Sequence, residues 1–311
     1  MQAYPNRRRR AEERDWLTFL DQKKKWILFG LLAMLLSLLL LSYYQSNQSF
    51  RDQTYTVSSP HLPNAFNGYT ICQISDLHGH FLKEGGKKLL AHIDQGEADL
   101  IVLTGDLISY GHRYSNQEKK NMGLFLKALK ERKPTYYILG NHELLLEKKG
   151  EGQWLTDQLQ AAGILDLTHR NLPVLHNGGR IQLAGFQEDL RFYANREEGP
   201  AGDIQTHLPA YDPEYYQILL AHNPLYWPAY QAWGADLTIS GHMHGGGLRL
   251  PFLGGVFSPD FSLFPFYDRG QFEQGLHTLI LSAGLGNSGL PFRLFNPMEL
   301  VWIHLESKSI H

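Results

Sequence analysis

Short apolar runs of strand length recur along most of the chain. They are rich in β-branched and aromatic residues, which favour extended structure over helix. The pattern predicts β-strands within GYTICQIS (68–75), ADLIVLT (98–104), TYYIL (135–139), YQILLA (216–221), ADLTIS (235–240), LHTLILS (276–282) and ELVWIHL (299–305).

Segments with helical periodicity separate the early runs. Apolar residues recur at the spacing of one helix face in NQEKKNMGLFLKALKE (116–131), and GGKKLLAHIDQG (85–96) and GQWLTDQLQAAG (152–163) are similar. After about Ile164 strands predominate. An alternating start followed by a strand-rich second half predicts an α/β layered sandwich, in which two mixed β-sheets pack together and helices flank them.

A different pattern fills the N-terminal region. Residues Trp26 to Ser42 form a run of 17 residues without a charge, at the lower end of the roughly 17 to 25 that span a bilayer. The run has no polar face, which a buried core helix would show. It is followed by SYYQSNQSF rather than by a small-x-small cleavage site, so we expect an uncleaved anchor, with a cleavable signal peptide as the alternative.

Charge sets the expected orientation of this anchor. Basic residues precede it at Arg7–Arg10, Arg14 and Lys23–Lys25, whereas only Arg51 follows closely. The positive-inside rule therefore places the N-terminus in the cytoplasm and the rest of the chain outside. The expected division is a basic cytoplasmic N-terminus (1–25), a transmembrane anchor (26–42), a linker (43–53) and one domain (54–311).

Composition narrows the picture further. With 311 residues, 43% of them hydrophobic, the chain can bury a large core. Its net charge of -2, with no block of like charge beyond residue 30, argues against nucleic-acid binding. The single cysteine, Cys72, excludes an intramolecular disulfide, and its apolar surroundings predict a buried thiol.

Side chains able to bind metal directly follow five of the apolar runs. They are Asp76 and His78, Asp106, Asn141 with His142 beside it, His222, and His242 with His244. Strand ends can converge on one edge of a layered α/β fold, where loops present functional groups on a rigid base. Aspartate, asparagine and histidine without cysteine suit Mn, Fe or Zn. The sequence therefore predicts a metal site at this edge.

The order of these motifs resembles the calcineurin-like metallophosphoesterases: Asp-x-His, Gly-Asp, Gly-Asn-His-Glu, a lone His, then Gly-His-x-His. The segments HMHGGGLRLP (242–251), YDRGQF (267–272) and SAGLGNSGLPFRLFNPMEL (282–300) are similar to the membrane-anchored bacterial phosphoesterases of this superfamily, which include hydrolases of UDP-2,3-diacylglucosamine. The resemblance covers residues 54–306 and implies the calcineurin-like layered sandwich.

The resemblance implies two divalent metal ions. One would be held by Asp76, His78 and His244, the other by Asn141, His222 and His242, with Asp106 bridging both. Cations about 3.5 to 4 Å apart can acidify a bridging water and polarise phosphoryl oxygens.

Two residues of the Gly-Asn-His-Glu motif have expected roles beside the metals. His142 would stabilise or protonate the leaving-group oxygen, with simple packing as the alternative, and Glu143 would support the site. Many members have aspartate where this chain has Ser109, which makes acid catalysis by His142 a weaker expectation than metal binding.

Several further residues have two interpretations. Arg249 and Arg293 would either bind a substrate phosphate or form ordinary salt bridges. The aromatic stretch 250–272 would form a flap over the core or a membrane-facing lip for a lipid-linked substrate. Met243 is expected to pack inward, and Gly245 and Gly246 to let substrate approach the backbone.

The implied function is hydrolysis of phosphodiester or pyrophosphate bonds in a phosphorylated substrate that is lipid-linked or part of the cell envelope. A surface phosphomonoesterase or nucleotide hydrolase is the alternative. A non-catalytic metal-binding scaffold is disfavoured, because competent side chains fill all seven ligand positions.

Overall fold

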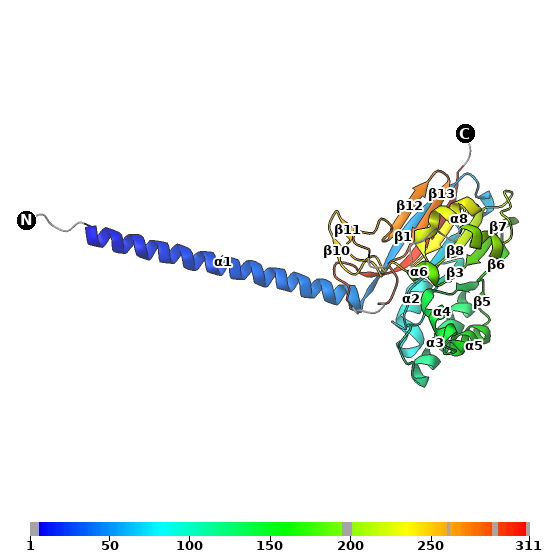
Figure 1. The fold of residues 1–311 in the computed structure, drawn as a ribbon, viewed down its shortest axis with the longest axis horizontal. Helices are drawn as coiled ribbons and strands as arrows, with labels where there is room; N and C mark the ends of the chain where they lie inside the picture. Colours follow the sequence, from blue (N-terminus) through cyan, green and yellow to red (C-terminus); the bar gives the residue numbers. More distant parts are fainter. Residues whose placement is uncertain (1–5, 195–200, 260–261, 288–291, 309–311) are drawn as a thin grey trace, which may run out of the picture.

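A computed structural model describes residues 6–194, 201–259, 262–287 and 292–308. One long helix, α1 (Asn6–Gln48), projects from a domain that contains all the other elements (Figure 1). Its segment Phe19–Gln48 is long and apolar enough to cross a membrane, and only 6% of its apolar window is buried in the structure. By length and composition, this segment fits either a membrane anchor or a signal sequence.

The domain is built on two six-stranded mixed sheets. In spatial order, the first sheet contains β1 (Phe50–Ser59), β14 (Met298–Ser307), β2 (Thr70–Ile74), β3 (Leu100–Thr104), β4 (Thr135–Ile138) and β5 (Leu165–Asp166). The second contains β12 (Gly270–Gln274), β13 (His277–Leu281), β9 (Leu237–Ser240), β8 (Gln217–Ala221), β7 (Gly179–Phe186) and β6 (Arg170–His176). A small separate ribbon pairs β10 (Arg249–Leu250) with β11 (Gly254–Gly255).

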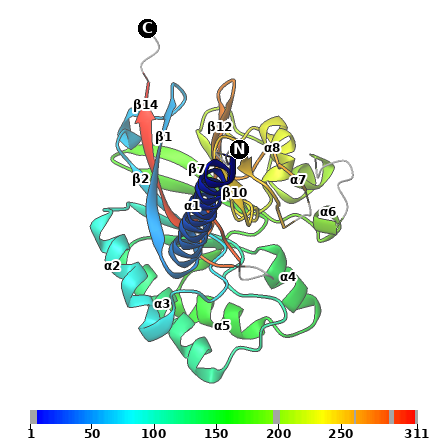
Figure 2. The same ribbon diagram turned by 90° about the vertical axis from the view of Figure 1, so that its left-hand side faces the viewer.

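Helices cover the outer faces of both sheets (Figure 2). Those of the first half of the domain are α2 (Lys87–Gln95), α3 (Asn116–Arg132), α4 (Asn141–Lys148) and α5 (Gln153–Ala162). Those of the second half are α6 (Arg191–Ala194), α7 (Ala201–His207) and α8 (Trp227–Trp233). Single 3-10 turns occur at Asn64–Phe66, Lys83–Gly86 and Pro224–Tyr226.

Successive side chains of the central strands point to opposite faces of the sheet, which gives the domain two apolar layers. In β2, Ile71 belongs to the apolar cluster between the two sheets, whereas its neighbour Cys72 faces the cluster under the helices. The same alternation separates Val102 from Leu103 in β3. Strands covered on both faces are apolar throughout, which is why they appear in the sequence as continuous runs. Cys72 is buried, as predicted.

The structure confirms the predicted fold class, all seven strands and the three helices. It adds elements without a clear sequence pattern, notably β1, which pairs in parallel with β14 over its whole length. Residues 43–53, expected as a linker, continue α1 to Gln48 and begin β1 at Phe50. The helix therefore enters the first sheet almost directly.

One buried side chain links the two sheets beneath the edge where the candidate ligands lie. Gln73, on β2, is fully buried and donates from Nε2 to Ser240 O on β9 at 2.8 Å and to Thr104 Oγ1 on β3 at 2.9 Å. Ser240 O also accepts from Ser282 N at 3.0 Å, so Gln73 adds a second donor to this carbonyl and links the two sheets through one side chain.

We predict that Gln73→Met lowers the free energy of unfolding by about 1–3 kcal/mol, because Ser240 O loses its side-chain donor. Denaturant unfolding of the purified chain measures this change. The control is Gln95→Met, at the exposed end of α2, which should leave stability unchanged. Equal stability of the two variants would contradict the role given to Gln73.

Candidate metal centre

The candidate ligands meet at one edge of the two sheets, although they come from five separate loops. Side-chain atoms of Asp76, His78, Asp106 and His244 all lie within 4.8 Å of one another. A second group of the same compactness contains Asp106, His222 and His242. All these residues are buried, and Asp106 is common to both groups. The predicted convergence of the strand ends is therefore present in the structure.

Backbone conformation shows how these residues are forced to face one another. The φ angle is positive at Asp76 (49°), Asp106 (54°) and His244 (53°), and also at His78 and His242. This left-handed region is uncommon for residues other than glycine and carries strain that the surrounding structure must hold. Strain gathered at one cluster of polar residues is typical of a functional site.

Glycines allow the strand-end loops to approach closely. A Cβ built at Gly140 would lie 2.2 Å from Asp106 Oδ1, and one at Gly241 would lie 2.4 Å from Asp76 Oδ2. Both positions therefore exclude any side chain. Close contact with the neighbouring loops therefore requires glycine at both positions.

The donor set suits a divalent cation. Asn141 Oδ1 and His222 Nε2 are buried, and neither has a hydrogen-bond partner among the residues that the structure describes. On the other side of its ring, His222 Nδ1 lies 2.7 Å from Thr104 O, which holds the proton on Nδ1 and leaves the Nε2 lone pair facing Asp106 Oδ2 at 3.3 Å. Buried polar atoms of this kind need a partner, and a cation between the carboxylates would provide one.

Two serines orient the first group. Ser75 Oγ donates to Asp76 Oδ2 at 2.6 Å. Ser109 Oγ lies 3.1 Å from His78 Nδ1, so the His78 ring turns its other nitrogen, Nε2, towards His244. The residue that departs from the family pattern thus contacts His78 rather than His142. Polar partners of this kind fix the orientation of metal ligands.

Burial and charge set the protonation of the cluster. Burial lowers the pKa of His78 to about 3 and that of His244 well below its usual value, so both rings offer lone pairs at neutral pH. Burial acts to raise the pKa of Asp106, but the facing His142 and His222 outweigh it and hold that pKa well below its usual range. Burial likewise opposes the protonation of His222, yet the Asp106 carboxylate raises the pKa of His222 to about 10. A proton and a metal cation would therefore compete for Nε2 of His222, which faces Asp106.

Glu143 ties the central loops together from behind. Its Oε2 accepts hydrogen bonds from the N–H groups of Asp106 and Gly140, both at 2.8 Å, and its Oε1 accepts from Ile108 N at 3.1 Å. Burial raises the pKa of Glu143 to about 8, whereas these backbone donors act in the opposite direction. The side chain binds no solvent-facing group and fixes the backbone on both sides of Asp106.

His142 lies at the rim of the cluster with a defined tautomer. Tyr110 N donates to His142 Nδ1 at 2.8 Å, so in the neutral ring the proton is on Nε2. Nε2 lies 3.9 Å from Asp106 Oδ2. In this tautomer the ring presents its Nε2–H beside the cluster.

Sequence reasoning missed a second buried carboxylate, Glu188. It accepts hydrogen bonds from the hydroxyls of Tyr193 and Tyr230 and from Asn223 N, which adjoins His222. The Tyr193 ring contacts the His242 ring, with centroids 5.0 Å apart. Glu188 follows β7, so the rule that polar residues at strand ends carry chemistry would have found it.

The two arginines do not face open solvent. Arg293 is only 2% exposed, and its Nη2 lies within 2.6 Å of Ala283 O, 2.7 Å of Gly286 O and 3.1 Å of His244 Nδ1. Arg249 forms the salt bridge that was the alternative interpretation, with Asp268 at 2.8 Å. Neither arginine side chain is therefore exposed on the surface where it could bind a phosphate of the substrate.

Close packing within the protein accounts for the glycines after His244, and the predicted approach of substrate to their backbone stays a prediction. A Cβ at Gly245 would lie 2.5 Å from Asn296 Oδ1, and one at Gly246 would lie 2.8 Å from the Gly255 backbone. Packing within the protein therefore requires these glycines. Met243 is fully buried in the apolar cluster under α8, as predicted.

This fold, with a buried Asp/His cluster at the edge of its sheets, defines a metallophosphoesterase. The family model described as calcineurin-like phosphoesterase matches residues 69–246, and the chain belongs to this family. The matched region contains every candidate ligand.

Relatives carry similar descriptions. The uncharacterized metallophosphoesterase YkuE of Bacillus subtilis is 28% identical, over 82% of this chain and 85% of that protein. The uncharacterized metallophosphoesterase Cj0846 of Campylobacter jejuni is also 28% identical, over 91% of this chain and 71% of that protein. Among solved structures, TT1561 of Thermus thermophilus covers 70% of this chain and 91% of its own at 14% identity, with a TM-score of 0.44. The UDP-diacylglucosamine hydrolases are not among these relatives.

We predict that Gly140→Ala lowers both the metal content and the hydrolytic rate, the latter about 100-fold, because the new Cβ displaces Asp106. Metal analysis of the purified chain and a phosphoester assay measure these effects. Gly152→Ala is the matched control, since the nearest atom to its Cβ would be 3.4 Å away. Wild-type metal content in Gly140→Ala would contradict this account of the loop contacts.

Proposed function

We propose that the domain hydrolyses phosphodiester or pyrophosphate bonds with the help of two divalent cations. The observation that carries this proposal is the sharing of Asp106 between two compact groups of buried ligands. In this proposal Asp76, His78 and His244 hold one cation, Asn141, His222 and His242 hold the other, and Asp106 touches both. The absence of thiolate from the donor set favours Mn, Fe or Zn.

The protein's own groups define the rest of the chemistry. When bound, the two cations would supply Lewis acidity and an activated water. The backbone N–H groups of His242 and His142 donate to Asp76 Oδ1 at 3.0 Å and Asp106 Oδ1 at 2.9 Å, so each carboxylate keeps a fixed orientation. Preorganised groups of this kind stabilise charge that develops during a reaction without having to move.

His142 is proposed to stabilise the leaving group as a neutral donor. Its Nδ1 accepts from Tyr110 N, so the ring proton of the neutral tautomer is on Nε2, the nitrogen that lies 3.9 Å from Asp106 Oδ2 and would donate to an oxygen of the substrate. Of the two expected roles, stabilisation suits this tautomer better than proton transfer, because giving up the only ring proton of a neutral imidazole is unfavourable.

For His142→Ala we predict a fall in kcat of about 100- to 1,000-fold, because one donor to the transition state is lost. Metal content should stay at the wild-type value, since His142 is no ligand in this proposal. Steady-state kinetics on bis-nitrophenyl phosphate, with metal analysis, measure both quantities. His112→Ala, which removes an exposed histidine paired with Glu118, is the control. An unchanged kcat in His142→Ala would rule out this role.

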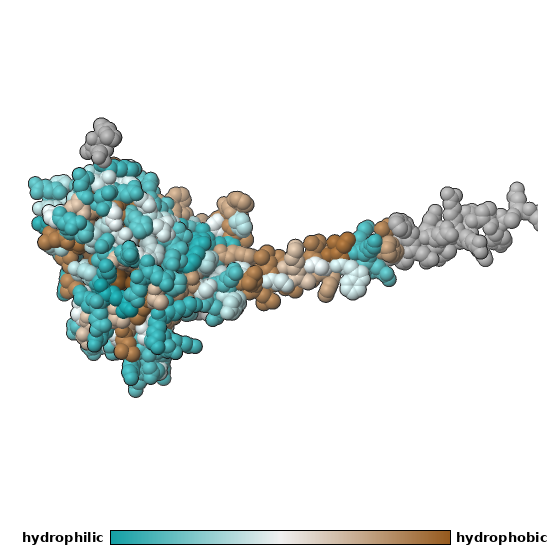
Figure 3. Space-filling model, turned by 180° about the vertical axis from the view of Figure 1, so that it is seen from behind, coloured by the Kyte–Doolittle hydropathy of each residue, from teal (hydrophilic) through white to brown (hydrophobic). Residues whose placement is uncertain are grey.

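The surroundings of α1 favour a substrate at the membrane. Large apolar side chains stand exposed near β10 and β11, on the side of the domain from which α1 leaves (Figures 1 and 3). They are Phe252, at 107% of its reference area, Leu253, Leu263, Phe264 and Phe266. Apolar surface of this extent is unusual on a domain surrounded by water. It suits a lip at the bilayer surface that receives a lipid-linked substrate.

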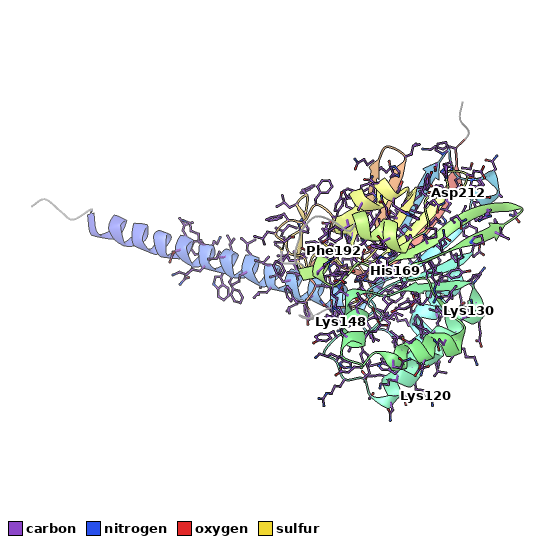
Figure 4. All side chains as sticks on the ribbon, turned by 45° about the vertical axis from the view of Figure 1, so that its right-hand side comes forward. Lys120, Lys130, Lys148, His169, Phe192 and Asp212 are labelled. Carbon is purple, nitrogen blue, oxygen red and sulfur yellow. The ribbon has the colours of Figure 1, made fainter. Side chains whose placement is uncertain are left out.

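Charged side chains of both signs gather beside α4 and α6, at another part of the domain surface (Figure 2). A hollow of the surface is lined by Lys148, His169, Glu188 and Arg191, among others. Figure 4 places Lys148, His169 and Phe192 towards the end of α1, whereas Lys120 lies on the remote helices. Glu188 connects this hollow to the residues around His222.

We propose the corresponding arrangement of the whole chain. Residues 1–25 would lie in the cytoplasm, 26–42 would span the membrane as an uncleaved anchor, and the domain that follows would face outward. The basic residues before the apolar span support this orientation.

We predict that the double variant Phe252→Ser with Leu253→Ser slows hydrolysis of a lipid-linked diphosphate in vesicles at least tenfold, because the lip no longer enters the bilayer surface. Hydrolysis of soluble bis-nitrophenyl phosphate should not change. Leu175→Ser alters an equally exposed leucine on β6, away from α1, and serves as control. Equal loss on both substrates would contradict the lip, and a clear preference for nitrophenyl phosphate would favour a monoesterase.

A further inference from the structure

The last turn of α1 is bonded to the domain through its side chains. Asn47 Oδ1 accepts from Arg293 N at 3.1 Å, and Asn47 Nδ2 donates to Arg293 O at 2.8 Å. Ser42 Oγ accepts from Phe295 N at 2.7 Å, and Ser46 Oγ accepts from Asn296 N at 3.2 Å. These three helix residues are buried, although most of the helix is exposed. The helix end therefore supplies partners to four backbone groups in the segment 293–296.

The segment 293–296 has no regular structure of its own. It lies between α1 and the loop that carries the Gly-His-x-His motif, because Leu294 N donates to Gly247 O at 2.9 Å. Without the serine and asparagine side chains of α1, the N–H groups of Arg293 and Phe295 would lose these partners. The helix therefore helps to hold the segment, together with the bonds of Leu294 to Gly247 and Arg249.

Two side chains of this segment reach His244 directly. Asn296 Nδ2 donates to His244 O at 2.7 Å, which fixes the backbone at this strained residue. Arg293 lies against the imidazole, with Nη2 3.1 Å from His244 Nδ1. Since Ala283 O and Gly286 O take both hydrogens of Nη2, the guanidinium acts on the ring as a fixed neighbouring cation. His244 therefore has its backbone and its ring held by residues that α1 holds.

We infer that the last turn of α1 is a positioning element of the metal centre, acting on His244 through Asn47, Arg293 and Asn296. This inference rests on the proposed function for the identity of His244 as a ligand. A helix that served only as a membrane tether would not need the hydrogen bonds that Asn47, Ser42 and Ser46 make with the domain. Cleavage after residue 42 would remove the apolar span together with Ser42 but leave Ser46 and Asn47, whereas cleavage after Asn47 would remove all three.

If this inference holds, the metal centre lies close to the membrane surface. The turn that supports His244 follows the apolar span without interruption, because α1 runs unbroken to Gln48. The metal centre is thus held beside the point where the chain leaves the bilayer, within reach of a substrate whose lipid part stays in the membrane.

The variant Asn47→Ala tests whether the end of α1 supports His244. It is measured in the full-length chain purified in detergent. The metals are removed with a chelator, and Mn²⁺ is titrated back while bound Mn²⁺ and activity are followed. We expect the affinity of one of the two sites to fall about tenfold or more, as is typical when a partner of a metal ligand is lost. The other site should keep wild-type affinity, because the hydrogen bonds of Arg293 and Asn296 to the metal centre go to His244. Saturating Mn²⁺ should restore kcat with KM unchanged.

Ser49→Ala is the matched control, since Ser49, directly after α1, donates from Oγ only to Gln45 O on the helix in the described hydrogen bonds. If Asn47→Ala fails to accumulate, Ser46→Ala removes a single bond to Asn296 N and should show the same selective loss on a smaller scale. Unchanged affinity of both sites, or equal weakening of both, overturns the inference. Fewer than two Mn²⁺ ions in the wild-type protein would instead overturn the proposed function, and the inference with it.

Discussion

The burial of two carboxylates close together is the constraint on which the rest of the structure depends. Asp76 is fully shielded from solvent and Asp106 nearly so, and both belong to one compact group. Buried charge of one sign is costly unless donors or cations compensate it. Backbone N–H groups, Ser75 and the facing imidazoles provide part of this compensation. In the proposed function, divalent cations would complete it, and the buried Asp/His cluster at this edge of the sandwich is consistent with a metal site.

The strain in the loops follows from the same constraint. Left-handed residues are tolerated where surrounding contacts determine the backbone, and here the sheets, Glu143 and the close glycines provide those contacts. Gln73 fixes how one sheet meets the other just below. The two linked sheets form a rigid base, which holds loop conformations whose backbone would be strained in isolation. In this way the fold brings residues from five loops to one place.

Much of this could be predicted from the sequence, because strands buried on both faces are apolar without interruption and polar motifs follow them directly. β2 and β3 with Asp76 and Asp106 are examples. β1 was not predicted, since its exposed and buried positions do not alternate clearly and its pairing with β14 joins opposite ends of the chain. The roles of Asn47 and Arg293 were equally hidden, because they depend on contacts across 246 residues. Ser109 seemed to weaken His142, yet its contact is with His78, and a backbone N–H orients His142 instead.

The end of the long apolar helix is hydrogen-bonded to the segment 293–296, which in turn contacts His244. Everything in this account requires two cations at Asp106. Anomalous diffraction at the manganese edge from crystals of the full-length protein grown with Mn²⁺ tests this most directly. The account predicts two peaks, about 3.5 to 4 Å apart, on either side of the Asp106 carboxylate. A single peak, or none in contact with Asp106, would contradict it.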